Sequence, residues 1–192
     1  DEPFFMFVGP LGPHDPYFVP QRFLDLYDPD DIRLPDNFDD DLSDKPTLYR
    51  WTKERYSQLT REEHRESIRR FYAFCSYEDE LFGRLLDAVE ARGLMDNTLI
   101  LYTSDHGESL GDHGIYLKGP YCYETGVHVP FIIHWAGHTL QGVTRDSLVE
   151  MLDIAPTLCD AAGIEKPLSF QGRSFLPLVT ENVPDHHRDS VY

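Results

Sequence analysis

The sequence predicts an α/β fold in which a mainly parallel sheet is covered by helices on both sides. Short apolar runs that are typical of buried strands alternate along the chain with longer segments of helical periodicity. Such alternation favours a parallel sheet, because each helix carries the chain back across a face of the sheet. The sequence contains no internal repeat.

The first expected strand covers residues 3–8, where apolar residues run together until Gly9 and Pro10 interrupt them. A long loop interrupted by prolines follows this strand. Much of the acidity of the chain lies in this loop, between Asp25 and Asp44. We expect the acidic run to be a mobile surface loop, and a calcium site is the alternative.

A long helix is expected to begin after Thr60, because Thr60 and Glu63 have the spacing of a capping box. Gly93 is the expected carboxyl cap. Between them apolar residues recur at helical spacing, namely Ile68, Phe71, Tyr72, Cys75, Phe82, Leu85, Leu86 and Val89. Asp79 falls on this stripe, so we expect it to be buried and bonded to nearby backbone rather than catalytic.

The second half of the chain is expected to contain two strands and a helix. Residues 98–104 and 131–135 are predicted to be buried strands. The helix that follows has Pro156 in its first turn and Gly163 just past its end.

Composition limits the classes of function. The chain has 192 residues with 17 basic and 34 acidic side chains, which argues against a nucleic-acid surface. Three scattered cysteines predict neither a disulfide framework nor a zinc site. We find no apolar run of about 18 residues and no signal peptide, so periplasmic, secreted and cytoplasmic locations all stay open.

The segment 99–118 carries the richest chemistry. It reads L-I-L-Y-T-S-D-H-G-E-S-L-G-D-H-G-I-Y-L-K, a short strand followed by a glycine-broken turn with Asp105 and His106 side by side. A carboxylate and an imidazole at the end of a strand make half of a metal site, and open α/β sheets carry their chemistry on such loops. Lys118 brings a positive charge to the same rim.

The motif in this segment and further segments of the chain resemble motifs of the sulfatase family. T-S-D-H-G-E-S-L-G-D-H-G, then Lys118, then V-P-F-I-I resemble the carboxyl-terminal half of a sulfatase. P-F-F-M-F-V-G-P-L-G-P-H-D-P-Y resembles the family strand that ends in a Pro-His-x-Pro turn. M-L-D-I-A-P-T-L-C-D-A-A-G-I and F-Q-G-R-S-F-L-P-L-V resemble its late helix and following loop. The resemblance implies an alkaline-phosphatase-like fold, with residues 1–192 forming the carboxyl-terminal portion of a single catalytic domain.

The nucleophile motif of the family is absent from this sequence. Sulfatases carry an early Cys/Ser-x-Pro-x-Arg motif whose Cys or Ser becomes formylglycine, together with an early Asp-Asp pair. Cys75, Cys122, Cys159 and all the serines lack this pattern, and no early Asp-Asp pair follows a strand. We therefore expect a fragment of a longer enzyme that is inactive by itself.

The resemblance implies metal-dependent hydrolysis of a small-molecule or saccharide sulfate ester. Asp105 and His106 are the expected ligands of one divalent ion. Calcium is expected first, and manganese, iron or zinc are alternatives because one ligand is an imidazole. His14 and Lys118 are the expected sulfate-binding and acid groups. His113 either binds substrate or only fixes its loop.

Two alternatives to a sulfatase stay open. A phosphonate or phosphate ester hydrolase of the same superfamily would share the Asp-His-Gly turn and the formylglycine nucleophile. A non-catalytic domain would instead use the remaining pocket to bind an anion or a partner. An oligomer is compatible with either, and the alcohol part of the substrate stays open because variable loops contact it.

Overall fold

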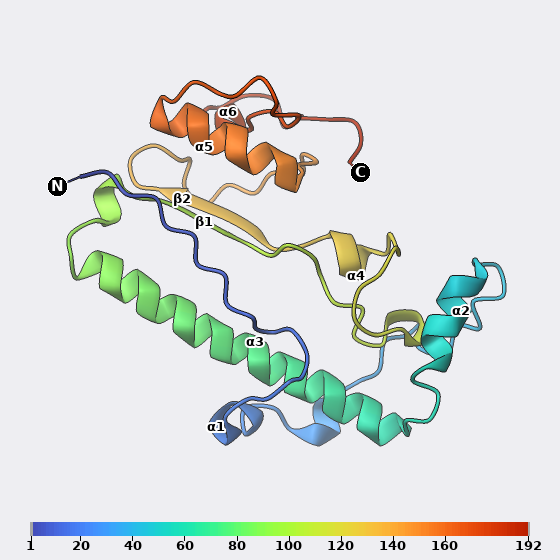
Figure 1. Cartoon of the computed structure of the whole chain (residues 1–192). Helices are drawn as coiled ribbons and strands as arrows, with labels where there is room; N and C mark the ends of the chain where they lie inside the picture. Colours follow the sequence, from blue (N-terminus) through green and yellow to red (C-terminus); the bar gives the residue numbers. More distant parts are fainter. Residues whose placement is uncertain (1, 192) are drawn as a thin grey trace. The chain divides into compact units, whose positions relative to one another are not determined.

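The computed structural model describes residues 2–191, which form two compact units. The first unit contains the residues up to Arg92 together with His106–Val129. The second contains Gly93–Asp105 together with the residues from Pro130 onward. The long helix α3 marks the first unit, and strands β1 and β2 mark the second (Figure 1). Among the described residues, no helix combines the length and the apolar character needed to cross a bilayer.

Helix α3 (Arg61–Glu90) begins where the sequence predicted. The Thr60 hydroxyl accepts a hydrogen bond from the Glu63 N–H at 3.2 Å, and the Glu63 carboxylate accepts one from the Thr60 N–H at 2.7 Å. This reciprocal capping box satisfies donors that have no partner within the helix. The helix ends at Glu90 with Ala91 as its carboxyl cap, so the expected cap at Gly93 is wrong. Gly93 lies two residues beyond Ala91 and has a positive φ of 64°.

The expected burial of Asp79 is wrong, because Asp79 is exposed. Asp79 lies about three turns beyond Ile68 on the same helical face, and Ile68 is buried. Tyr72 and Leu85, on the predicted apolar stripe, are exposed as well. The apolar stripe extends beyond the segments that pack on the first turns of α3, so position on the stripe does not ensure burial.

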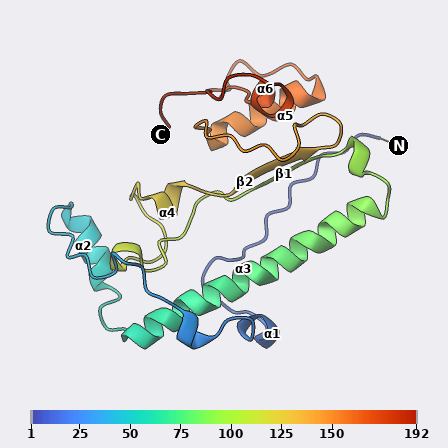
Figure 2. The same cartoon turned by 180° about the vertical axis from the view of Figure 1, so that it is seen from behind.

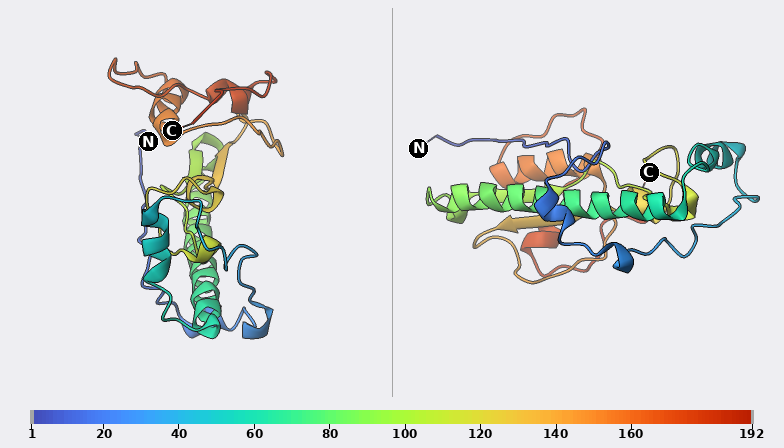
Figure 3. Two further views of the ribbon diagram at one scale, coloured as in Figure 1. Left: turned by 90° about the vertical axis from the view of Figure 1, so that its right-hand side faces the viewer. Right: turned by 90° about the horizontal axis from the view of Figure 1, so that it is seen from below.

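The first half of α3 forms a core with α1 (Gln21–Leu24), which lies against it (Figure 3). Phe23 and Leu24 pack on Ala73 in this core. The Arg69 side chain donates to the carbonyl oxygens of Leu24 and Tyr27, both at 2.8 Å. The same unit contains the short elements η1 (Pro29–Asp31), α2 (Thr47–Glu54), η3 (Asp112–Gly114) and α4 (Glu124–Val127).

The acidic run is packed at its carboxyl-terminal end rather than forming a wholly solvated loop. Leu42 is completely buried and packs with Ile115 and Tyr121. The Lys53 ammonium donates to the carbonyl oxygens of Phe38 at 3.0 Å and Asp40 at 2.5 Å. The expectation of a mobile surface loop is therefore wrong here, because apolar residues between the acids anchor the segment.

Strands β1 (Leu99–Thr103) and β2 (Phe131–Trp135) form at the predicted positions but pair antiparallel (Figure 2). Leu99 faces Trp135, and Thr103 faces Phe131. The chain leaves β1 at Thr103 and re-enters β2 beside it, so the second strand runs back along the first. The expected mainly parallel sheet is thus absent from the part of the chain that the structure describes.

The predicted strand at residues 3–8 is also wrong for this structure. The segment has no regular secondary structure, and the side chains of Phe5 and Phe7 are 79% and 85% exposed. A strand needs a neighbouring backbone to complete its hydrogen bonds. Within residues 2–191 the only sheet is the pair of β1 and β2, so this apolar run has no sheet neighbour.

The second unit continues through η2 (Met95–Asn97), η4 (Met151–Asp153), α5 (Ile154–Ala162) and α6 (Leu176–Thr180). Helix α5 ends at Gly163 in the left-handed conformation, as the sequence predicted. Phe175 is buried and packs edge-on against Phe131 with ring centroids 5.4 Å apart. This contact joins the residues before α6 to the sheet.

Candidate functional site

His14 lies in the turn that follows the exposed apolar run. Its ring Nδ1 is 2.7 Å from the backbone oxygen of Asp15 and 3.0 Å from the Asp15 carboxylate. A carbonyl oxygen can only accept a hydrogen bond. His14 Nδ1 therefore carries a proton and donates a hydrogen bond to Asp15. In the neutral imidazole this leaves the lone pair on Nε2.

The ammonium of Lys118 contacts that same Nε2 of His14, although the two residues are 104 positions apart in the sequence. An ammonium group has only donors, so Lys118 donates and the His14 ring accepts. Both side chains are exposed. The structure thus brings together two of the residues that the sequence proposed for sulfate binding.

Lys118 directly follows a tight loop, residues 109–117, whose backbone groups are hydrogen-bonded to one another. The Ser109 N–H donates to the Leu117 carbonyl at 3.0 Å, and the Gly111 N–H donates to the Ile115 carbonyl at 2.8 Å. Ile115 and Tyr116, which belong to this loop, are buried. Gly111 has a φ of 92°, a conformation that side chains with a Cβ rarely adopt. The loop therefore presents Lys118 from a packed base.

The glycine of the Asp-His-Gly turn is required by a close approach of backbone. A Cβ on Gly107 would lie 1.9 Å from the carbonyl oxygen of Thr125 in α4. The Gly107 N–H also donates to the Gly126 carbonyl at 2.9 Å. The turn that carries His106 is thereby held directly against α4.

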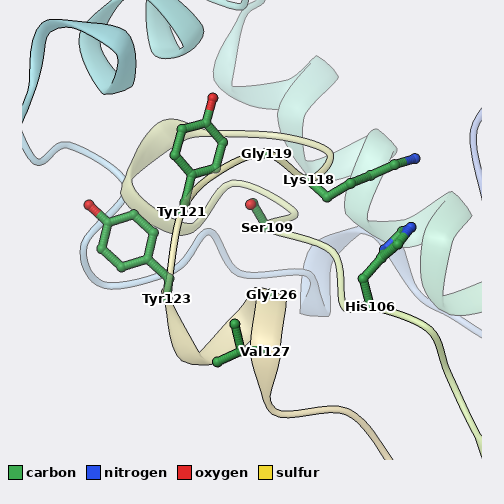
Figure 4. Close-up of a pocket in the computed structure, with 8 residues that line it drawn as sticks. All are labelled: His106, Ser109, Lys118, Gly119, Tyr121, Tyr123, Gly126 and Val127. Atoms are coloured by element: carbon green, nitrogen blue, oxygen red, sulfur yellow. The ribbon is translucent and has the colours of Figure 1, made fainter. Parts of the chain in front are cut away.

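His106 has the same ring arrangement as His14. Its Nδ1 is 2.8 Å from the Gly107 carbonyl oxygen, so Nδ1 donates and Nε2 is the nitrogen suited to metal binding. A pocket is lined by His106, Ser109, Lys118, Gly119, Tyr121, Tyr123, Gly126 and Val127. Figure 4 shows the side chains of His106 and Lys118 pointing to one side of this pocket, away from the rings of Tyr121 and Tyr123.

Asp105 directly precedes His106 in the chain and lies two residues beyond the end of β1, where its side chain is exposed. Carboxylate oxygens and imidazole nitrogens are both suitable ligands for a divalent ion. Within residues 2–191 no group of three or more His, Cys, Asp or Glu side chains could hold a metal ion. Asp105 and His106 by themselves thus offer the ligand chemistry of two positions and not a complete metal site.

His113 is held by the acidic segment of the same unit. Its Nδ1 is 2.6 Å from the Asp40 carboxylate, and its ring stacks on Tyr123 with centroids 4.2 Å apart. The Asn37 side-chain oxygen accepts from the His113 N–H at 3.1 Å. These contacts agree with the alternative in which His113 fixes its loop.

Two acidic residues near Lys118 were given no role from the sequence. Asp15 contacts His14, as described above, and Glu108 accepts hydrogen bonds from the N–H groups of Leu110 and Leu117. Burial raises the pKa of Glu108, while these two N–H groups act in the opposite direction. Burial, and then the charge of Glu108, raises the pKa of Tyr17. The sequence signal for Asp15 was its place in the motif P-H-D-P, and that for Glu108 was its place in D-H-G-E.

Comparison with known proteins identifies the family of the chain. The model of the family described as Sulfatase matches residues 1–164. The chain belongs to the sulfatase family. It is 32% identical over 187 residues to an arylsulfatase of Clostridium perfringens, covering 94% of this chain and 38% of that protein. It is 33% identical to a choline-sulfatase of Rhizobium meliloti, covering 92% of this chain and 35% of that protein.

The fold is shared with solved structures of the same superfamily. The phosphonate monoester hydrolase of Agrobacterium radiobacter matches with a TM-score of 0.87 and 28% identity, covering 98% of this chain and 40% of that one. The family and these neighbours place the sulfatase chain within the alkaline-phosphatase-like superfamily. The chain spans 38% and 35% of the length of the two sulfatases named above.

Proposed function

We propose that this sulfatase-family chain supplies part of the active site of a sulfuric ester hydrolase. The observation that carries the proposal is the contact between Lys118 and His14, which gathers a fixed positive charge and an imidazole at one point. A sulfate ester repels nucleophiles because its oxygens are negative, so hydrolysis requires donors directed at those oxygens. Lys118 supplies such a donor, and His14 would supply a second one when both of its ring nitrogens carry a proton.

In the proposed reaction, the Lys118 ammonium donates hydrogen bonds to a sulfate oxygen and neutralises charge that develops there. His14 is the proposed acid for the departing alcohol, with the proton delivered from Nε2. In the structure Nε2 accepts from Lys118, so this role requires a second proton on the ring. The Asp15 carboxylate, 3.0 Å from Nδ1, would stabilise the resulting imidazolium.

Asp105 and His106 are the proposed ligands from this chain for one divalent ion. Calcium is the first choice, and manganese, iron or zinc are the alternatives because a nitrogen donor is present. When bound, such an ion would neutralise the ester oxygens and lower the barrier to attack. The remaining ligands and a formylglycine nucleophile would come from residues outside this sequence. His106 suits this role because its Nδ1 is oriented by the Gly107 carbonyl.

The proposed substrate is a small-molecule or saccharide sulfate monoester. Relatives named arylsulfatase and choline-sulfatase support sulfate as the acid part. The phosphonate monoester hydrolase, with a TM-score of 0.87, supports a second candidate, cleavage of a phosphonate or phosphate ester. We infer further that both units belong to one catalytic domain, which the match over 98% of this chain supports. We also propose that the sheet is mainly parallel in the full protein.

Turnover by the full-length protein tests the proposal. An aryl sulfate and an aryl phosphonate monoester with the same leaving group would be compared at equal metal concentration. We expect a higher kcat/KM for the sulfate. A higher value for the phosphonate would favour the second candidate, whereas no turnover of either ester with the nucleophile present would contradict a hydrolase.

A further inference from the structure

Glu108 directly precedes the loop of residues 109–117, which Lys118 follows, and the proposed reaction gives its side chain no role. Its Oε1 accepts a hydrogen bond from the Leu110 N–H at 3.2 Å and a second, shorter one from the Leu117 N–H. The side chain is partly buried. A carboxylate moved out of water needs such bonds to compensate for lost hydration.

The two residues that donate to Glu108 are both in unusual backbone conformations. Leu110 has a φ of 45° and Leu117 a φ of 64°, in the left-handed region that residues with a Cβ rarely occupy. Such conformations persist only where surrounding contacts impose them. At Leu117 the contacts act on both sides of the residue, because its N–H donates to Glu108 and its carbonyl accepts from Ser109 at 3.0 Å.

The direction of Lys118 follows from the conformation of Leu117, its neighbour in the chain. A change of Leu117 to an ordinary extended or helical conformation would turn the following peptide and move the Lys118 side chain away from His14. We propose that Glu108 is a positioning residue, whose carboxylate fixes Leu117 and thereby directs the Lys118 ammonium to Nε2 of His14.

This inference rests on the proposed role of Lys118 in sulfate binding, so the test in the full-length protein includes a readout that needs no turnover. The variants are Glu108→Ala, which removes the acceptor, and Glu108→Gln, whose amide oxygen can accept from the same two N–H groups. Glu90→Ala, at the exposed end of α3, is the matched control. The readouts are kcat and KM for an aryl sulfate and the ¹⁵N chemical shift of the His14 ring Nε2.

We expect Glu108→Ala to lower kcat/KM by about tenfold to a hundredfold, the usual effect of losing a group that orients a functional side chain. The loss should fall mainly on kcat, and the Nε2 signal of His14 should shift. Glu108→Gln should recover most of both, and the Glu90→Ala control should behave as the unmodified protein. Unchanged kcat/KM and an unchanged Nε2 signal in Glu108→Ala would overturn the proposal.

A double-mutant cycle separates positioning from an independent effect. If Glu108 acts through Lys118, adding Glu108→Ala to Lys118→Ala should cause no further loss of kcat/KM. An equal loss in both backgrounds would overturn the proposal. If Glu108→Ala does not fold, Glu108→Asp, which is one methylene shorter, takes its place with the same expectations.

The His14 Nε2 signal separates the positioning role of Glu108 from the catalytic role of Lys118. Normal turnover by Lys118→Ala would contradict the proposed function of Lys118. In that case the His14 Nε2 signal still tests the positioning, because a shift in Glu108→Ala supports it and an unchanged signal overturns it.

Discussion

The guanidinium of Arg188 donates a hydrogen bond to the carboxylate of Asp153, which is completely buried. The same carboxylate accepts from the backbone N–H groups of Glu150 at 3.0 Å and Arg173 at 2.9 Å. Arg188 also pairs with the Glu150 carboxylate at 2.8 Å. This network joins the carboxyl-terminal segment to the start of α5.

Loss of Arg188 should destabilise the protein strongly. Arg188→Ala leaves Asp153 buried without its charged partner, which typically costs about 3 to 5 kcal/mol of unfolding free energy. Denaturant unfolding in the full-length protein measures the change. Arg92→Ala is the control, because Arg92 is exposed and bonds only the carbonyl of Ala88 among the interactions described for it. A loss below about 1 kcal/mol, the scale of a surface pair, would contradict the network.

Stability should also depend on pH through Asp153. Burial raises the pKa of Asp153, but the N–H groups of Arg173 and Glu150 and the charge of Arg188 outweigh it, so the net pKa is lowered from 3.8. A carboxyl whose pKa is lower in the folded state contributes stability above its unfolded pKa, and this contribution is lost as the pH falls. The stability difference between the unmodified protein and Asp153→Asn should therefore shrink below about pH 4.

The other groups that face this carboxylate set the design of the pH experiment. His187 lies 3.2 Å from the Asp153 carboxylate through its Nε2, and Glu150 lies against Arg188. The series should be repeated in His187→Gln, so that protonation of the imidazole is not mistaken for that of Asp153. A difference that stays constant from neutral pH to pH values well below the usual carboxyl range would contradict the assignment.

Lys118→Ala in the full-length enzyme should reduce kcat/KM for an aryl sulfate by about 10²-fold or more, the scale for one oxyanion donor. Metal content should not change, because Lys118 is not a proposed ligand. Lys166→Ala, which removes an exposed lysine paired with Asp160, is the control. Near-normal efficiency of Lys118→Ala would show that the sulfate-binding group is misassigned.

Asp105→Ala should remove both metal and activity. The carboxylate supplies one of the two ligands proposed from this chain, and affinity for divalent ions depends on ligand number and charge. Metal content by elemental analysis and turnover should fall together. An inactive variant that keeps a full equivalent of metal would exclude Asp105 as a ligand.

Residues 1–192 by themselves should not hydrolyse sulfate esters and should bind divalent ions only weakly. The sequence lacks the Cys/Ser-x-Pro-x-Arg motif, and loss of a nucleophile removes nearly all of the rate. Calorimetry with calcium and manganese measures the binding. Tight binding, or measurable aryl-sulfatase turnover, would contradict this expectation.

Two local signals in the sequence predicted the limits of helices correctly. The capping box of Thr60 and Glu63 marks the start of α3, and Gly163 marks the end of α5. Both depend on bonds or conformations within a few residues. The direction of β2 depends instead on where the intervening segment returns the chain, which a run of apolar residues does not encode.

The same distinction applies to the candidate site. His14 and Lys118 were identified through their motifs, and their contact is a tertiary one across 104 positions. Glu108 was missed because its bonds go to backbone N–H groups, whose availability depends on the left-handed conformations of Leu110 and Leu117. The D-H-G-E motif marks the position of Glu108, but it does not show to which backbone N–H groups the carboxylate is bonded.

The pairing of Thr103 with Phe131 means that the chain between β1 and β2 starts and finishes at adjacent points of one ladder. That stretch carries the Asp-His-Gly turn and Lys118. The two end points are therefore fixed by one strand pair, and a counterpart from another sulfatase grafted between the same strands would also have to replace the packing of Ile115 and Tyr121 on Leu42. Chimeras built at these junctions would change the side chains around the Asp-His-Gly turn and Lys118 while keeping β1 and β2 the same.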